Sequence, residues 1–241
     1  MTLVEILASL FPNGHDVILD HGLLSGQGDL PGGGSIIVLG VDGRTAVGID
    51  EAIRLSGKVL EVVKRGRKNP ILVLIDSDSQ RMSKRDELLG LSEFLAHLAK
   101  CLILADAFGS RTIGLLYGHT AAGAFIATAM ATRTLVALPG AEPVVMDLPS
   151  MSRVTKLPIE VLEEKAKSTP VFAPGLDNVA QTGAIAAILD PNISLATQVI
   201  ALLKKPLDAA DTRGRLGKER RGRPKAADIA ERVYGLVHGN L

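Results

Sequence analysis

The feature that most constrains the fold of this 241-residue chain is a run of five consecutive apolar residues, ILVLI, at residues 71–75. Pro70 precedes the run and Asp76 ends it. A strand with one face in water alternates apolar and polar residues, whereas an unbroken apolar run predicts a strand that is buried on both faces. Such strands belong to parallel sheets with helices on both faces. The run therefore predicts an α/β fold.

The segments on either side of this run alternate between strand and helix patterns. Residues 13–34 hold seven glycines and predict a long loop around a short apolar run at 17–19. Asp50 is the predicted N-cap of the helix that follows it. The alternation predicts a mostly parallel sheet with covering helices. Strands are predicted at 35–40, with 44–49 as its partner, and at 71–75, 112–116, 134–138 and 144–146; helices are predicted at 50–65, 86–106 and 120–132.

The last part of the chain differs from the rest in charge. Residues 204–225 contain nine Lys and Arg against three Asp and Glu, so this segment carries +6 and the remaining chain carries −5. Beyond residue 146 the sequence is predicted to be helical, with a short final helix at 226–238. We predict one domain over residues 1–205, followed at 206–241 by a basic linker and the final helix.

Composition and motif spacing exclude several classes of protein. Aromatic residues make up 3% of the chain and Trp is absent, which argues against a platform that stacks single-stranded nucleic acid. Cys101 is the only cysteine, so we expect no disulfide framework, no cysteine-based zinc site and a cytoplasmic location. The five His residues include no HxxxH pair, which gives no support for a metal site. Residues 112–132 carry no charge, but few of them are strongly apolar, so no membrane span is expected.

One segment, YGHTAAGA at residues 117–124, lies between a predicted buried strand and a helix of small residues. Its two glycines have the spacing of a phosphate-binding loop, but Ala124 and Phe125 stand where that loop needs Lys and Ser or Thr. Backbone N–H groups at a helix start are unpaired and carry partial positive charge, and small residues let a ligand approach them. Such a turn can stabilise an oxyanion or an enolate. The candidate catalytic residues are Gly118, His119, Thr120, Ala121, Ala122 and Gly123, with His119 as a proton carrier.

A second candidate segment follows the apolar run. The carboxyl ends of parallel strands lie at one edge of a sheet, where α/β proteins place their sites. We therefore expect residues after the strands at 71–75 and 112–116 to face one crevice. The candidate substrate-binding residues are Ser77, Asp78, Ser79, Gln80 and Tyr117. Each candidate also has a structural alternative: close helix–sheet packing for the small residues, a hydrogen-bonded turn for His119, and helix capping for the polar segment.

Three stretches resemble a known family. They are GLLSGQGDLPGGG at 22–34, YGHTAAGAFIA at 117–127 and ALPGAEPVVMDLPSMSRVT at 137–155. The sequence from about residue 10 to residue 203 is similar to the γ subunits of biotin-independent malonate decarboxylase, which are related to the C-terminal half of acyl-CoA carboxyltransferases. The resemblance implies a crotonase-like ββα superhelix and a β-subunit partner. It also implies an acyl carrier protein that bears the malonyl thioester on its prosthetic group, decarboxylation to the acetyl thioester, and no cofactor bound by this chain.

The sequence departs from the carboxyltransferase pattern at two places. Ala121 and Ala122 stand where those enzymes have paired glycines, and the segment DSDSQ at 76–80 lacks a glycine. We therefore expect at most one oxyanion hole in this chain, with the β subunit supplying the other. Two alternatives stay open: a non-catalytic scaffold that docks the carrier protein through the basic segment, and a crotonase-type acyl-CoA hydratase or isomerase.

Overall fold

The computed structural model describes residues 1–32, 34–66, 68–170, 173–206, 208 and 210–239. Contacts within the chain divide it into two units. The first comprises Met1–Val145 with Ile188–Lys205, and the second comprises Met146–Ala187 with Pro206–Leu241. The division into residues 1–205 and 206–241 that the sequence suggests stays a prediction.

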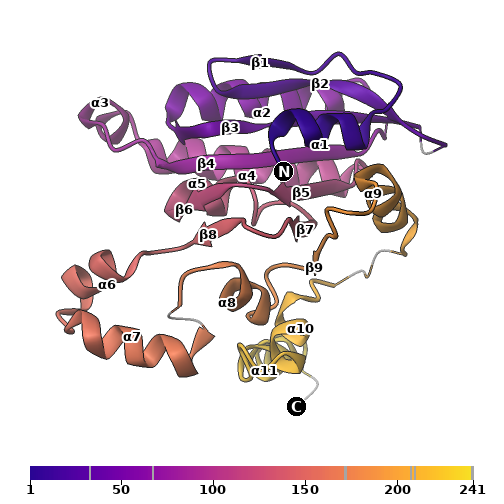
Figure 1. The fold of residues 1–241 in the computed structure, drawn as a ribbon. Helices are drawn as coiled ribbons and strands as arrows, with labels where there is room; N and C mark the ends of the chain where they lie inside the picture. Colours follow the sequence, from indigo (N-terminus) through magenta and orange to yellow (C-terminus); the bar gives the residue numbers. More distant parts are fainter. Residues whose placement is uncertain (33, 67, 171–172, 207, 209, 240–241) are drawn as a thin grey trace. The chain divides into compact units, whose positions relative to one another are not determined.

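The first unit is built on a sheet in which parallel strands form the centre (Figure 1). Strands β3, β4, β5 and β7 pair in parallel, and β1 and β2 extend the sheet from β3 in antiparallel fashion. The sheet has the order β1 (Ile18–Asp20), β2 (Leu23–Leu30), β3 (Gly34–Val47), β4 (Ile71–Gln80), β5 (Thr112–Leu116), β7 (Thr134–Ala137) and β9 (Ala187–Ile188). Two short strands, β6 (His119–Ala121) and β8 (Glu142–Val144), pair in parallel as a separate sheet.

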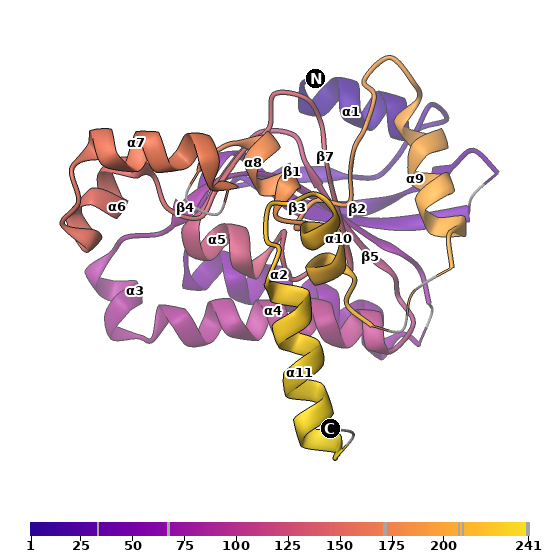
Figure 2. The same cartoon turned by 90° about the horizontal axis from the view of Figure 1, so that it is seen from below.

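Helices cover both faces of this sheet. Helices α2 (Ile49–Lys64) and α4 (Leu91–Ala107) run side by side on one face, and α1 (Leu3–Leu10) lies on the other, where it contacts α9 (Leu195–Lys204) (Figure 2). Residues from α2, α4, α5 (Ala122–Ala127) and β3 form one apolar cluster. Residues Ile71 to Ile75 of β4 are all buried. The predicted α/β class and the doubly covered strand are confirmed.

The glycine-rich segment contains a strand that the sequence analysis missed. Residues Leu23–Leu30 form β2 and pair with β3 over their whole length, so the predicted loop at 13–34 is wrong over this part. Gly26 and Gly28, in the middle of the strand, concealed the alternation that marks a strand. The segments predicted as a strand at 35–40 and a partner at 44–49 are one strand, β3, whose partners are β2 and β4.

The helix boundaries also differ from the predicted ones. Helix α2 begins at Ile49 with Gly48 as its N-cap, so Asp50 lies in the first turn rather than at the cap. The helix predicted at 86–106 is two helices, α3 (Lys84–Leu88) and α4, because Gly90 has a φ of 86° and interrupts the helical backbone. The helix predicted at 120–132 is shorter, because His119–Ala121 form β6 before α5 begins.

The second unit is helical, as predicted. The Arg220 guanidinium donates hydrogen bonds to the carbonyl oxygens of Ala180 and Ile185, each at 2.7 Å, and of Ala186 at 3.0 Å. The predicted final helix at 226–238 is confirmed, and a helix just before it was not predicted. The helices are α6 (Leu148–Thr155), α7 (Ile159–Ser168), α8 (Leu176–Gln181), α10 (Arg213–Glu219) and α11 (Ala226–His238). No helix within the described residues combines the length and hydropathy that crossing a membrane requires.

The contact between β3 and β4 predicts the effect of a small substitution. A Cβ added at Gly40 of β3 would overlap the carbonyl oxygen of Leu74 on β4, and backbone in a central strand has little room to move. Gly40→Ala is expected to lower the free energy of unfolding by about 2 kcal/mol or more.

The control is Gly57→Ala on the exposed side of α2, where a Cβ would meet no atom within 4 Å. It is expected to raise the free energy of unfolding by about 0.5–1 kcal/mol, because Ala is the better helix former. Urea unfolding followed by circular dichroism measures both. Equal stability of the two variants would contradict the β3–β4 packing.

Candidate active site

The central strand β3 is interrupted near its carboxyl end. Its register with β4 shifts between Val41 and Thr45, and at this point Gly43 and Arg44 have φ values of 67° and 53°. This break turns the side chains of Asp42 and Arg44 toward groups on the neighbouring elements. Neither residue is among the candidates that the sequence predicts. The Asp-Gly pair, a common turn signal, was the one local indication of the break.

Tyr117 joins this part of β3 to the end of β5. Its hydroxyl donates a 2.6 Å hydrogen bond to Asp42 Oδ1. Burial raises the pKa of Tyr117 far above its ordinary value, and the hydrogen bond to Asp42 and the charges of Asp42 and Asp76 raise it further. Tyr117 is therefore a neutral donor that is already engaged within the chain. It lies beside the predicted turn, but its hydroxyl supports β3.

Asp76 holds the turn against the end of β4. The N–H of His119 donates to Asp76 Oδ1 at 2.9 Å, and the N–H of Gly118 points to the carbonyl oxygen of Ile75 at 3.4 Å. A Cβ at Gly118 would overlap the Asp76 carboxylate. Position 118 therefore requires glycine, and two N–H groups of the turn already have acceptors within the chain.

Gln80 caps the helix that follows the turn. The N-cap of α5, Ala121, has no side chain that can accept a hydrogen bond, and Ala122 has a φ of 48° where the chain bends into the helix. Gln80 Oε1, at the end of β4, accepts a 2.9 Å hydrogen bond from the N–H of Gly123. The side-chain amide oxygen of Gln80 thus already accepts a hydrogen bond from one backbone N–H of the predicted oxyanion site.

The remaining residues predicted at the strand end have different surroundings. Ser77 and Thr120 are fully buried, and their hydroxyl oxygens lie 2.8 Å apart in a hydrogen bond that joins β4 to β6. Asp78 is exposed. Ser79 is half-buried, and its hydroxyl donates to the carbonyl oxygen of Gln80 at 3.1 Å. The prediction that the two strand ends meet is confirmed by these contacts, whereas the substrate-binding role of the residues stays a prediction.

His119 faces an ion pair that the sequence analysis did not select. Its Nδ1 is buried and has no hydrogen-bond partner among the described residues. The nearest opposite charge is Glu142 Oε2 at 3.7 Å, and the Arg44 guanidinium lies 3.0 Å from the same oxygen. Glu142 lies directly opposite His119 in the β6–β8 pairing. The three side chains form a chain of contacts that runs from β3 through β8 to β6.

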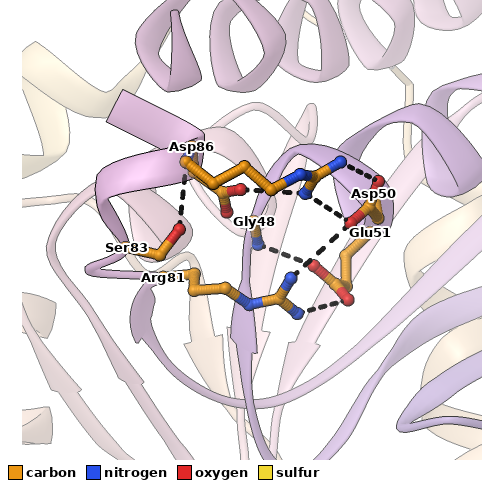
Figure 3. Close-up of polar contacts among 7 residues, drawn as sticks. Gly48, Asp50, Glu51, Arg81, Ser83 and Asp86 are labelled. Carbon is orange, nitrogen blue, oxygen red and sulfur yellow. Dashed lines mark hydrogen bonds and ion pairs between the residues drawn. The ribbon is translucent and has the colours of Figure 1, made fainter. Parts of the chain in front are cut away.

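A second polar network lies behind Gln80, where β4 ends and α2 begins (Figure 3). The Arg81 guanidinium bonds Glu51 Oε1 at 2.5 Å, and the N–H of Gly48 donates to Glu51 Oε2 at 2.9 Å. Arg85 holds both oxygens of Asp50 at 2.8 and 3.1 Å, and this hydrogen bonding holds the pKa of Asp50 below its ordinary value. The network fixes the residue next to Gln80 to the first turn of α2.

Asp86 is the most enclosed member of this network (Figure 3). Its side chain is 1% exposed, and its Oδ1 accepts from Arg85 at 3.1 Å. Ser83 Oγ accepts the N–H of Asp86 at 3.1 Å and so caps α3. Asp86 Oδ2 lies against Gly48 without a hydrogen-bond partner among the described residues. The network is thus tightly packed and serves to hold the backbone of the strand end.

The turn brings together backbone N–H groups, a partly exposed imidazole and an adjacent carboxylate. Polarising a carbonyl oxygen and delivering a proton would need donors and an acid of these kinds. Across the residues that the structure describes, no group of three or more His, Cys, Asp and Glu could hold a metal ion. A cleft of about 360 Å³ lies elsewhere, between β1, β2, β3 and α2, and none of the predicted site residues lines it.

Comparisons with known proteins cover most of the chain. Residues 43–237 match the profile of the malonate decarboxylase gamma subunit family. The malonyl-S-ACP:biotin-protein carboxyltransferase of Malonomonas rubra is 28% identical over 187 residues, which are 73% of this chain and 64% of that protein. The chain thus spans less than two thirds of the length of this curated relative. The resemblance stated from the sequence is confirmed.

Solved structures share the fold. A Pseudomonas malonate decarboxylase hetero-tetramer in complex with coenzyme A superimposes with a TM-score of 0.76 at 24% identity, covering 99% of this chain and 98% of that chain. The Pseudomonas MdcD-MdcE hetero-dimer gives 0.73 at 24% identity and covers 98% of both chains. Transcarboxylase 12S gives 0.65 at 15% identity, covering 87% of this chain and 42% of that chain. These carboxyltransferase neighbours confirm the predicted crotonase-like fold.

The network behind Gln80 predicts a stability effect of Glu51→Gln. The substitution keeps an oxygen that can accept from Gly48 but removes the charge that Arg81 faces, at a position where Glu51 is 13% exposed. We expect the free energy of unfolding to fall by about 1–2 kcal/mol. Glu164→Gln, in the exposed Glu164–Lys167 pair, is the control and should change it by less than about 0.5 kcal/mol. Urea unfolding measures the free energy of unfolding of both variants. Equal losses would show that the Glu51–Arg81 pair stabilises the protein no more than the exposed pair does.

Proposed function

The chain belongs to the malonate decarboxylase gamma subunit family, and from this premise we propose that it works with a β subunit to decarboxylate a malonyl thioester. The thioester is carried by the prosthetic group of an acyl carrier protein, the products are the acetyl thioester and CO₂, and the complex acts in the cytoplasm. The observation that carries this proposal is the extent of the family match, because residues 43–237 include the whole turn and every contact of His119 described above.

The reaction makes two chemical demands on the site. The bond between the carboxylate carbon and the adjacent CH₂ breaks, and its electron pair moves into the thioester carbonyl as CO₂ leaves. The resulting enolate oxygen needs hydrogen-bond donors, and the carbon needs one proton to give the acetyl group. In this proposal the chain itself binds no cofactor, because backbone donors and one acid meet both demands.

The proposed donor site is the turn at residues 118–123, whose backbone N–H groups have different roles. Those of Gly118 and His119 are directed at Ile75 and Asp76, so they hold the turn in place. The N–H of Gly123 is the donor that an enolate oxygen can reach, by replacing Gln80 Oε1 at the same 2.9 Å position. Gln80, Asp78 and Ser79 then line the substrate, whereas Ser77, Thr120 and Tyr117 support the turn. The β partner supplies the other oxyanion hole.

His119 is the proposed proton donor. Its side chain is 20% exposed, so the ring reaches the surface at the edge where the turn lies. An imidazole titrates near neutral pH, which suits proton transfer to the carbanion carbon. Glu142 Oε2 lies 3.7 Å from its Nδ1.

The proposed division of labour between subunits can be tested by reconstitution. The purified chain alone is expected to release no CO₂ from a malonyl thioester, because it holds only one oxyanion site. Mixing it with the β subunit should restore release. The measurement is CO₂ formation from a malonyl thioester on the carrier protein, with each subunit alone as a control. Full activity of the isolated chain would overturn the requirement for a partner.

The backbone donor can be tested by Gly123→Val. A Cβ at position 123 would lie 3.1 Å from both Gln80 Oε1 and Leu95 Cδ1, so a branched side chain displaces the acceptor and blocks the N–H. Turnover by the assembled complex should fall about 100-fold or more, the usual effect of losing an oxyanion donor. Gly57→Val, the same change at an open position on α2, is the control and should leave turnover unchanged. Size-exclusion chromatography checks assembly, and normal turnover in an assembled Gly123→Val complex would remove this donor from the mechanism.

A further inference from the structure

Helix α11 (Ala226–His238) has 13 residues and buries none of them. A helix of this length is marginal in water by itself, because most of the stability of a helix in a protein comes from packing its apolar face against another element. In α11 the apolar face is present but uncovered. Its large side chains are between 55% and 73% exposed, and they are Ile229, Val233, Tyr234, Leu236 and Val237.

These side chains share one side of the helix. Val233 lies four residues after Ile229 and three residues before Leu236, which places the three on one face. Val237 lies one turn after Val233, and Tyr234 borders the stripe. The exposed apolar surface is on the order of 500 Å², as large as the largest apolar patch of a typical monomer, and patches of this size are often interaction sites.

The chain holds α11 by its opposite side. Lys218 of α10 forms an ion pair with Asp228, and a Cβ added at Gly214 of α10 would lie 3.7 Å from the Cα of Ala227. Gly235, seven residues after Asp228, is half-buried on the same side as that aspartate. An amphipathic helix normally turns its apolar face toward its own chain. Helix α11 does the reverse, so its apolar face is available to another molecule.

The helix belongs to the part of the chain that its family shares. The family profile extends to residue 237 and so includes all but the last residue of α11. The alignment with the Pseudomonas hetero-dimer covers 98% of this chain, and a hetero-dimer contains a second subunit that differs from the first. A face that a family shares fits a partner that the family shares. That argument favours the β subunit over a second copy of this chain.

The apolar character of the face favours a permanent partner. A carrier protein has to leave after it delivers its thioester, and interfaces that form and separate are only about as apolar as the rest of the protein surface. Interfaces of permanent complexes are more apolar. A stable interface buries about 800 Å² on each partner, so α11 can supply a large part of one but not the whole.

We infer that the apolar face of α11 binds an apolar patch of the β subunit. Association removes five side chains from water and gives a marginal helix the packing that its own chain does not provide. The inference rests on the proposed function, because that proposal supplies the β subunit as the partner. It assigns α11 to assembly of the complex and not to the reaction.

Val233→Glu tests the face, because Val233 lies at its centre. The new carboxylate would be buried against an apolar patch, so the dissociation constant between the full chain and the β subunit should rise about 30-fold or more. Val4→Glu on α1 is the matched control, since it is the same change at a helical valine that is 77% exposed in the first unit. It should change the constant by less than about threefold.

Sedimentation velocity measures both dissociation constants, and circular dichroism checks that each variant keeps its helices. A large rise for Val233→Glu and a small one for Val4→Glu support the inference. Equal effects of the two substitutions, or no effect of Val233→Glu, overturn it.

Hydrogen exchange followed by mass spectrometry gives a second measurement, on the native chain. The amides of α11 should exchange quickly in the chain alone and at least about tenfold more slowly when the β subunit is added. Slow exchange in the chain alone at every concentration would show that the chain covers the helix itself. Slow exchange only at high chain concentration would identify a second copy, and protection by the carrier protein but not by the β subunit would identify the carrier. Each of these three outcomes overturns the inference.

Turnover by the complex separates this inference from the proposed function. At a saturating concentration of the β subunit, the Val233→Glu chain should release CO₂ at the native rate, and a lower rate would contradict the assignment of α11 to assembly alone. If the native chain and the β subunit release CO₂ while α11 stays unprotected, the docking inference fails and the proposed function stands. If α11 becomes protected but the mixture releases no CO₂, the docking stands and the proposed function fails.

Discussion

Burial of β4 on both faces is the constraint on which the rest of this molecule depends. Because residues Ile71 to Ile75 leave no room for a polar side chain, every polar group of this strand emerges together at its carboxyl end. There Asp76 binds the turn after β5, Ser77 binds Thr120 and Gln80 binds Gly123. One strand thereby positions three successive points of the turn. The arginine–carboxylate network that begins at Arg81 fixes this same carboxyl end of the strand to α2 (Figure 3).

The sequence predicted the features that follow from local pattern. The unbroken run at 71–75, the strand at 112–116 and the final helix at 226–238 were all correct, because each has a periodicity or an apolar run that tertiary contacts do not override. The meeting of two strand ends followed from the rule for parallel sheets. Strand β2 was missed because its glycines conceal the alternation, although its antiparallel partner β3 follows it closely in the sequence.

The site was only partly predictable for a similar reason. The turn at 117–123 could be found because its small residues follow a buried strand. Arg44 and Glu142 could not, since their importance comes from a bulge in β3 and from the β6–β8 register, which bring positions 98 residues apart into contact. Nor did the sequence indicate that a side-chain amide from β4 would take over the capping of α5. The backbone N–H groups predicted to be free are therefore partly occupied. The cause is a side-chain partner, Gln80, and not a difference in the path of the backbone.

The hydrogen bond between Gln80 and Gly123 has a consequence for selectivity. A ligand oxygen does not enter an empty donor; it competes with an amide oxygen that the protein already supplies. A neutral thioester carbonyl is a weaker acceptor than that amide, because sulfur donates less electron density to the carbonyl than nitrogen does, so the exchange yields no binding energy in the ground state. A charged oxygen forms a hydrogen bond roughly twice as strong. In the proposed reaction Gln80 therefore competes for the Gly123 N–H. The ground-state substrate does not displace it, whereas the enolate-like transition state that forms as CO₂ leaves does.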